Sequence, residues 1–145
     1  MNPIETLPQG TFSEFLKSEP VMGTAVDKFK IALYGDNGSQ LGWLGQNDDE
    51  WAILVTDESK ALTLELYPYD QVDYYRVKGT SRYMSVNRNA YIGFYNWSGA
   101  TGWKLDGEHL ISDYNNQKLS LYSKDNQYLY AWDKYNVLNV KLDTK

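Results

Sequence analysis

Apolar and polar side chains alternate along most of this chain in short runs, and Asn, Asp and Gly separate the runs. Residues 30–34 and 40–44 show this alternation on either side of Asp36-Asn37-Gly38, a sequence that readily forms a tight turn. Residues 118–122 and 128–132 repeat the plan further along. Because alternation with a period of two is typical of half-buried strands, the pattern predicts an all-β fold.

One short segment has the pattern of a helix instead. For residues 13–18, either Thr11 or Ser13 could act as the N-cap of a helix, and Pro20 would end it. The sequence therefore predicts one short helix near the N-terminus.

The strand-like runs recur in the same order in three segments. Between corresponding apolar positions the intervals are 10 and 10 residues in the first segment, 8 and 11 in the second, and 10 and 11 in the third. The positions are Ile31, Leu41 and Trp51; Met84, Ile92 and Trp103; and Leu119, Leu129 and Val140. Repetition at a few tens of residues predicts a fold built from three similar units.

The predicted units are unequal in length. Their first positions are separated by 53 residues and then by 35, so we expect about one additional hairpin in Thr56–Asp73. A chain of 145 residues fits a single domain, which we divide into units 21–55, 56–107 and 108–145.

Composition narrows the cellular setting. The chain has no cysteine, which excludes disulfides and thiolate metal sites and fits a reducing compartment. No signal-peptide pattern opens the sequence, and no apolar run is long enough to span a membrane. We expect a protein without membrane insertion that is cytoplasmic, or secreted without a classical signal peptide.

The net charge of the chain makes one class of partner, nucleic acid, an unfavourable match. A net charge of −5 and a pI near 4.8, with scattered lysines and arginines, argue against nucleic-acid binding, which needs a concentrated basic face.

Threefold repetition of about four short strands per unit, with inward aliphatic residues, resembles the β-trefoil superfamily, which includes the ricin-B-like lectins. The resemblance covers roughly residues 26–142 and implies a six-stranded barrel capped by three hairpins. Trp51, Trp103 and Val140 stand where the family's Gln-x-Trp repeat has its tryptophan. The glutamine is absent each time, since Asp49, Thr101 and Leu138 take its place.

The same resemblance bears on sugar binding. Ricin-type galactose sites need an aspartate in the second strand of a unit, where this chain has Ala32, Ser85 and Ser120. The resemblance therefore implies that no unit has a ricin-type galactose site. An aromatic residue at the end of the third strand is retained in two units, as Tyr95 and Trp132.

Aromatic residues next to polar ones are the candidate binding residues. An aromatic face stacks on the C–H face of a sugar ring, while amides and carboxylates bind its hydroxyls. The candidates for a carbohydrate site are Tyr95, Asn96, Trp97, Tyr130, Trp132, Asp133, Asn136 and Trp43. Alternatively, these aromatics form ordinary cross-strand pairs. We expect Trp51 and Trp103 to be core residues instead.

These features predict a carbohydrate-binding lectin whose partners are glycans or glycoconjugates, with sites on one or more units and no cofactor or metal. A protein-binding trefoil such as a protease inhibitor is the alternative, with Gln46–Glu50 and Thr56–Lys60 as its loops. Enzymatic activity is not predicted, because His109 is the only histidine and no catalytic motif occurs; a hydrolase with an unrecognised carboxylate pair ranks last. The sequence also allows a homo-oligomer.

Overall fold

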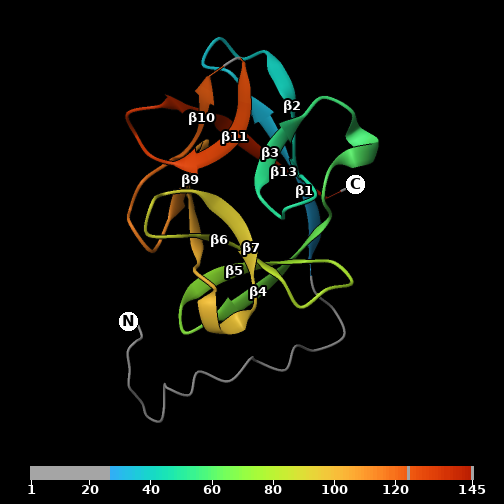
Figure 1. Ribbon diagram of the computed structural model, residues 1–145, viewed down its shortest axis with the longest axis vertical. Helices are drawn as coiled ribbons and strands as arrows, with labels where there is room; N and C mark the ends of the chain where they lie inside the picture. The colour runs from blue at the N-terminus through green and yellow to red at the C-terminus, as the bar shows by residue number, and fades with distance from the viewer. Residues whose placement is uncertain (1–26, 124, 145) are drawn as a thin grey trace.

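A computed structural model describes residues 27–123 and 125–144, which form thirteen antiparallel strands and two 3₁₀ helices (Figure 1). No α-helix occurs in this part of the chain, so the all-β prediction is confirmed, whereas the helix predicted at residues 13–18 lies outside it. The strands are β1 (Lys28–Tyr34), β2 (Gln40–Gln46), β3 (Ala52–Val55), β4 (Leu64–Tyr69), β5 (Val72–Val77), β6 (Tyr83–Val86), β7 (Ile92–Tyr95), β8 (Trp103–Asp106), β9 (His109–Ser112), β10 (Leu119–Ser123), β11 (Asn126–Ala131), β12 (Asn136–Val137) and β13 (Asn139–Asp143). The 3₁₀ helices are η1 (Glu58–Lys60) and η2 (Trp97–Gly99).

Tight turns join the strands where the sequence allows a left-handed backbone. Asp70 and Gln71 connect β4 to β5 with φ angles of 52° and 67°, a pair of positive values that matches the right-handed twist of a hairpin. Gly107 connects β8 to β9 with a φ of 62°. Polar residues and glycine at these points thus fix the register of two hairpins.

Six strands pair in succession. β1 pairs with β13 on one side and with β4 on the other, and the series continues from β4 to β5, from β5 to β8 and from β8 to β9. The N–H of Val140 in β13 donates to the carbonyl of Glu108, just before β9, at 2.8 Å. Strands from both ends of the described chain therefore contribute to one pairing system.

Three other strands, β3, β7 and β11, meet through single bridges that follow one rule. Trp51 bridges Gly93, Tyr91 bridges Tyr130, and Tyr128 bridges Ile53. The second residue of each bridge lies two positions after the aromatic residue that begins another bridge: Gly93 follows Tyr91, Tyr130 follows Tyr128, and Ile53 follows Trp51. Trp51, Tyr91 and Tyr128 therefore occupy equivalent positions, 40 and then 37 residues apart.

This correspondence differs from the one that the sequence predicts. Trp103 lies in β8 opposite Asp73, and Val140 lies in β13 opposite Leu33, so neither is equivalent to Trp51. With nearly even spacing there is no need for an additional hairpin in Thr56–Asp73, which contains η1, β4 and the start of β5. The alignment predicted from the sequence matches β1 with β6 and β10, one strand too early, because β2 is the strand equivalent to them.

One main hydrophobic cluster fills the interior between the strands. Its largest fully buried residues include Trp103, Phe94 and Ile31. The indole N–H of Trp103 donates to the carbonyl of Met84 at 2.7 Å, so its polar atom is satisfied inside the core. The prediction that Trp103 is a core residue is confirmed, whereas Trp51 is only partly buried and stands outside this cluster.

Residues 27–123 and 125–144 show neither a membrane-spanning helix nor a cluster of metal-binding side chains. None of their helices has the length and apolar character needed to cross a membrane. Nor do three or more histidine, aspartate or glutamate side chains of residues 27–123 and 125–144 come together as a metal site would require.

Candidate functional site

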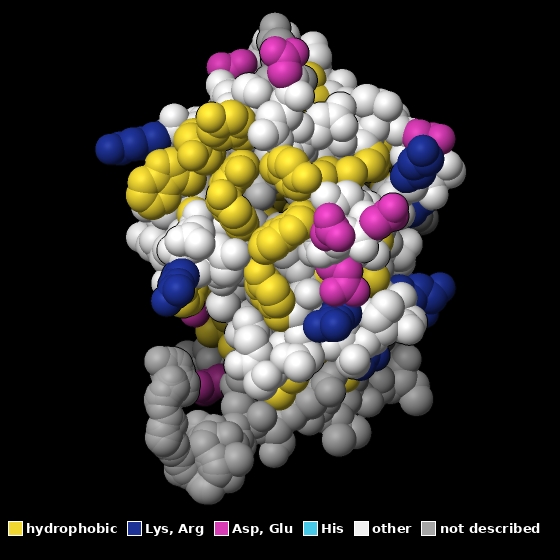
Figure 2. Space-filling model, in the orientation of Figure 1, with side chains coloured by type: hydrophobic (Ala, Val, Ile, Leu, Met, Phe, Trp, Pro, Cys, Tyr) yellow, Lys and Arg dark blue, Asp and Glu magenta, His cyan; other side chains and the backbone are white. Residues whose placement is uncertain are grey.

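Aromatic side chains gather on one face of the molecule. Figure 2 shows hydrophobic side chains grouped over the region where β10 and β11 lie beside β3 and β7 in Figure 1. We call six residues there the aromatic patch: Trp51, Tyr91, Tyr122, Tyr128, Tyr130 and Tyr135. Tyr91, Tyr122 and Tyr128 are 42%, 47% and 40% exposed, which is unusual for such large rings placed side by side.

Five of the six rings form a continuous series of contacts. The centroid of Trp51 is 5.7 Å from that of Tyr91, which is 4.8 Å from that of Tyr130. Tyr122 and Tyr135 contact Tyr130 at 5.9 Å and 5.1 Å and each other at 5.0 Å. Most of these contacts are edge to face, the arrangement that aromatic quadrupoles favour, so the rings hold one another in position.

Two matching turns position the first two rings. The side-chain oxygen of Asn47 accepts hydrogen bonds from the N–H groups of Asp49 and Trp51, at 2.9 Å and 3.0 Å. The side-chain oxygen of Asn87 likewise binds the N–H of Tyr91 at 3.1 Å. In both turns the residue before the aromatic one has a positive φ, 66° at Glu50 and 70° at Ala90. An asparagine four residues before an aromatic residue is therefore the sequence signal for this feature.

The turn of Asn47 also reaches the third equivalent aromatic residue. The side-chain N–H of Asn47 donates to the hydroxyl of Tyr128 at 3.4 Å. Because Asn47 also binds Trp51, one side chain links the aromatic residue that precedes β3 to the aromatic residue in β11. The spacing between these rings is thus set by hydrogen bonds as well as by packing.

A hollow of about 280 Å³ lies among the equivalent aromatics, and we call it the small hollow. It is lined by Trp51, Tyr91, Ile92, Asn126, Tyr128 and Tyr130. Its lining contains no charged side chain, but it offers phenol hydroxyls and the amide of Asn126 as hydrogen-bonding groups. The amide NH₂ of Asn126 has no hydrogen-bond partner within residues 27–123 and 125–144, so it is available to a ligand.

Two phenols of this region, those of Tyr130 and Tyr95, are held in the neutral form by raised pKa values. Burial raises the pKa of Tyr130, and the neighbouring hydroxyls of Tyr91 and Tyr135 raise it further. Burial also raises the pKa of Tyr95, although a hydrogen bond from Asn87 partly opposes the shift. These hydroxyls can therefore both donate and accept hydrogen bonds.

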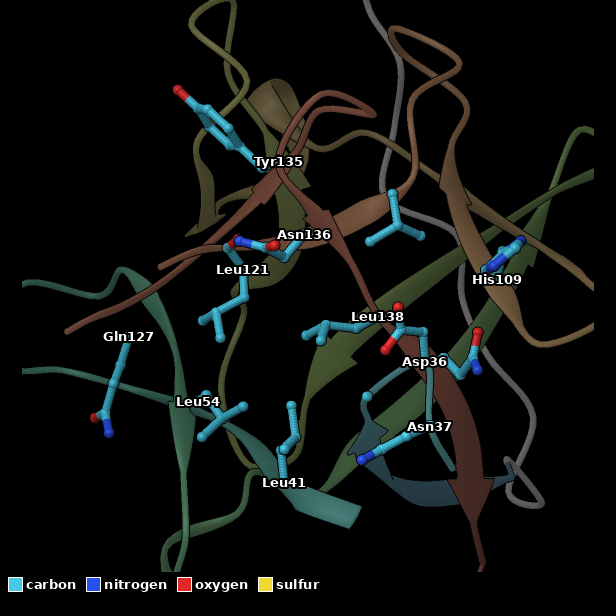
Figure 3. A pocket seen from close by; sticks show the side chains of 13 residues that line it. Asp36, Asn37, Leu41, Leu54, His109, Leu121, Gln127, Tyr135, Asn136 and Leu138 are labelled. Atoms are coloured by element: carbon cyan, nitrogen blue, oxygen red, sulfur yellow. The ribbon is translucent and has the colours of Figure 1, made fainter. Parts of the chain in front are cut away.

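A second, larger hollow of about 860 Å³ has a different character, and we call it the large hollow (Figure 3). Four leucines lie together in its centre, while polar side chains stand around them, with Asp36 and His109 on one side and Gln127 on the other. The leucines are Leu41, Leu54, Leu121 and Leu138. Tyr135 is its one aromatic lining residue, and its ring is directed away from the leucines. The large hollow therefore lacks an aromatic face for stacking.

Two of the candidate residues predicted from the sequence lie at or beside the aromatic patch. Tyr130 is part of it. Tyr95 is half-buried and lies next to it. Its hydroxyl and the Trp51 ring are both so close to Gly93 that a β-carbon built there would touch each of them. Asn136 lines the large hollow, and its NH₂ group donates to the backbone carbonyls of Leu121 and Tyr122 at 3.1 Å and 3.2 Å.

Trp97 lies in the 3₁₀ helix η2 between β7 and β8, but its side chain is buried. It is a candidate for stacking on a sugar, but Trp97 is only 6% exposed and belongs to a second buried cluster with Tyr67, Tyr83 and Ala100. Its ring centroid is 4.7 Å from that of Tyr74. Trp97 therefore offers little surface for stacking, because it fills the space beneath its own loop.

The other predicted residues lie apart from both hollows. Asn96 is exposed and its side-chain oxygen accepts a hydrogen bond from Ser98 at 2.8 Å. Trp132 is 38% exposed, and Trp43 is partly buried in β2. The carboxylate of Asp133 accepts the backbone N–H of Lys118 at 2.7 Å, so it joins two loops. These residues line neither the small nor the large hollow.

The residues that the sequence reasoning did not select are Trp51, Tyr91 and Tyr128. Trp51 is expected in the core because its repeat position matches that of Trp103, and the two tyrosines are not among the sequence-derived candidates. The asparagine turns before Trp51 and Tyr91 could have identified the correct alignment.

Comparison with known proteins adds no relative to this picture. No model of a protein family matches the chain. A search of curated proteins likewise finds no significant match.

Proposed function

We propose that this protein is a carbohydrate-binding β-trefoil whose sugar site is the small hollow within the aromatic patch. The observation that carries the proposal is the meeting of Trp51, Tyr91 and Tyr128 around an uncharged hollow. Sugar rings present an apolar C–H face and a polar rim. The aromatic rings of this site can stack on the face, and its neutral hydrogen-bonding groups can bind the hydroxyls of the rim.

The strand pairings support the trefoil part of the proposal. The succession β13, β1, β4, β5, β8, β9, with the hydrogen bond from Val140 to Glu108, is what a closed six-stranded barrel requires. The three hairpins β2–β3, β6–β7 and β10–β11 would cap it, and their bridges follow a threefold rule. Each unit then contributes two barrel strands and one hairpin, with the two-residue strand β12 added beside β10 in the third unit, in agreement with the spacing of 40 and 37 residues.

The choice of the small hollow over the large one rests on chemistry. Stacking needs an exposed aromatic ring, and four of the six residues that line the small hollow are aromatic. The leucines of the large hollow instead suit an aliphatic group. Of the two hollows, the small one is therefore the better match for a sugar.

A glycan array tests this proposal. Labelled wild-type protein should bind a related set of glycans, and Tyr128→Ala should lose that binding while its circular dichroism spectrum stays the same. Tyr114→Ala is the matched control, since Tyr114 is a tyrosine that is 53% exposed but lies outside the patch and the hollow. If Trp132→Ala removes binding and Tyr128→Ala does not, the sugar site is the one that the sequence predicts and not the small hollow.

Protein binding is the second candidate function, and the tyrosine-rich composition of the patch favours it. Exposed tyrosine and tryptophan are enriched at protein interfaces. The loop around η1 is also well ordered by hydrogen bonds, because the Asp57 carboxylate accepts both the N–H and the hydroxyl of Ser59. Two results together would replace the lectin proposal with this one. The glycan array would show no binding, and the wild-type protein would inhibit a protease whereas Ser59→Pro would not.

A further inference from the structure

We infer that the small hollow is a single site shared by all three repeat units, and that it takes one uncharged sugar residue per chain. This inference rests on the proposed function and deepens it. A trefoil lectin with one site in each unit would bind up to three sugars. The geometry described above points to one.

The bridges between strands carry the first step of the argument. Trp51 directly precedes β3 in the hairpin β2–β3, Tyr91 directly precedes β7 in the hairpin β6–β7, and Tyr128 lies in β11 of the hairpin β10–β11. Because each of them bridges to the next hairpin, the three rings are brought to a common point and not distributed around the molecule. A ligand among them would touch all three units at once.

The non-equivalent parts of the three units carry the second step. Two positions after the aromatic residues, the units have Ile53, Gly93 and Tyr130. Gly93 makes room for the indole of Trp51, while Tyr130 adds a fourth ring to the lining. The site is therefore asymmetric although its framework repeats, so it would hold one ligand in one orientation.

The charges carry the third step. The small hollow is lined only by neutral side chains. Nearby, Glu50 and Arg82 form an ion pair with each other at 3.7 Å, so their charges offset one another. A sialylated or sulfated sugar would lose part of its hydration without gaining a cationic partner in the lining, whereas a neutral sugar has no charge to desolvate. Binding of a neutral sugar should also depend little on salt.

The small size of the hollow carries the last step. About 280 Å³ is at the lower limit of the volumes found for small-molecule sites. Such a volume suits a single ring at the end of a glycan, with the remainder of the glycan in solvent. The exposed Tyr122 and the partly buried Tyr135 lie beside it, in contact with Tyr130, where they could meet a second ring.

Titration calorimetry with neutral methyl glycosides tests the inference. The probes are the methyl glycosides of galactose, glucose, mannose, fucose and N-acetylglucosamine, with N-acetylneuraminic acid as the charged probe. We expect one neutral probe to bind with a stoichiometry of one per chain, and the charged probe to give no heat. Affinity should change less than about twofold between low and physiological salt.

Single substitutions distinguish a shared site from separate ones. Trp51→Ala, Tyr91→Ala and Tyr128→Ala should each reduce the affinity for all bound sugar by about tenfold or more, because each removes a wall of the same site. Tyr114→Ala should leave both affinity and stoichiometry unchanged. Trp51→Phe should retain most of the affinity but lose the change in tryptophan fluorescence that sugar causes in the wild type.

Three results would overturn the inference. A stoichiometry of two or three, or a variant that loses only a fraction of the sites at unchanged affinity, would indicate a site in each unit while leaving the lectin proposal intact. Preferred binding of the charged probe would contradict the neutral site but also leave a lectin. No binding of any glycan, on the array or in the calorimeter, would remove both the inference and the proposed function.

Discussion

The indole of Trp51 lies against the backbone of Gly93, so closely that a β-carbon at Gly93 would be 3.1 Å from Cε3 and 3.2 Å from Cζ3 of the ring. The same β-carbon would be 3.3 Å from the hydroxyl of Tyr95. Because Gly93 does not have a positive φ, the lack of space and not the backbone conformation is what favours glycine here. Position 93 therefore controls where the indole stands.

Gly93→Ala should displace the Trp51 ring and weaken ligand binding, at a cost of about 1–3 kcal/mol in the free energy of unfolding. Urea titration and tryptophan fluorescence measure the two effects. The control is Gly99→Ala, since a β-carbon at Gly99 would meet Tyr95 at an ordinary contact distance of 3.5 Å. Equal behaviour of the two variants would show that the indole adjusts freely.

Ala90 occupies the left-handed position of the turn that carries Tyr91, with a φ of 70°. A residue with a β-carbon is strained there by about 1–2 kcal/mol, while glycine brings an entropic cost of about 0.5–1 kcal/mol. Ala90→Gly should therefore raise the free energy of unfolding by up to about 1 kcal/mol, as measured by urea titration. The matched control is Ala61→Gly, which should lower it, because Ala61 has an ordinary φ of −68°.

Glu65 is a nearly buried carboxylate, 8% exposed, whose Oε1 accepts hydrogen bonds from Arg76 Nη2 and Nε at 3.2 Å and 3.3 Å. Arg76 also lies over the ring of Tyr67, 4.8 Å from its centroid. Arg76→Met should lower the free energy of unfolding by about 3 kcal/mol, because it leaves the carboxylate without this partner.

The double variant Glu65→Gln with Arg76→Met should recover much of that loss in the same urea titration, because no buried charge remains. If the double variant is less stable than Arg76→Met alone, the cost comes from lost packing of Arg76 on Tyr67 and not from the carboxylate.

Buried tyrosines should make the protein sensitive to alkali. Burial, and to a smaller extent Asp113, raises the pKa of Tyr74 to about 12, and burial with Asp73 raises that of Tyr75 still more. An unfolded tyrosine has a pKa of about 10, so the folded state retains these protons longer than the unfolded state does. Their contribution to stability is complete below about pH 10 and is lost as the pH rises from there to about 12.

Urea titrations at several pH values between about 8 and 12 measure this loss. Tyr74→Phe should flatten the decline, because one group that titrates differently in the two states is removed. Tyr114→Phe should leave the slope unchanged, since Tyr114 is exposed. An unchanged slope in Tyr74→Phe would show that other groups cause the alkaline instability.

The strand content was predictable because it depends on local alternation. Ile31 and Leu33 in β1, and Leu119 and Leu121 in β10, are buried on one side as their spacing indicates. Tight turns were predictable for the same reason, since Asn37 binds the N–H of Ser39 within the turn itself. Chemistry within a few residues decides both features.

The equivalence of the units was not predictable from the apolar pattern, because every strand of a repeat has nearly the same pattern. A shift of the first unit by one strand matches Trp51 with Trp103. Trp51 is then expected in the core like Trp103, although only Trp103 is buried there. Pairing across hairpins, as between Trp51 and Gly93, is what fixes the alignment, and it joins residues far apart in sequence. Burial of Trp97 was missed for a similar reason, because β4 and β5 supply the tyrosines that cover it.

The pairing of β1 with β13 has a consequence for how the chain becomes folded. Lys30 pairs with Asp143 and Tyr34 with Asn139, so one edge of the first described strand stays open until the residues around position 143 have been synthesised. Contacts that distant in sequence make folding slow, because the chain must close a long loop before it gains them. During translation the exposed edge of β1 is thus the place where a nascent chain of this protein is most open to pairing with a neighbour.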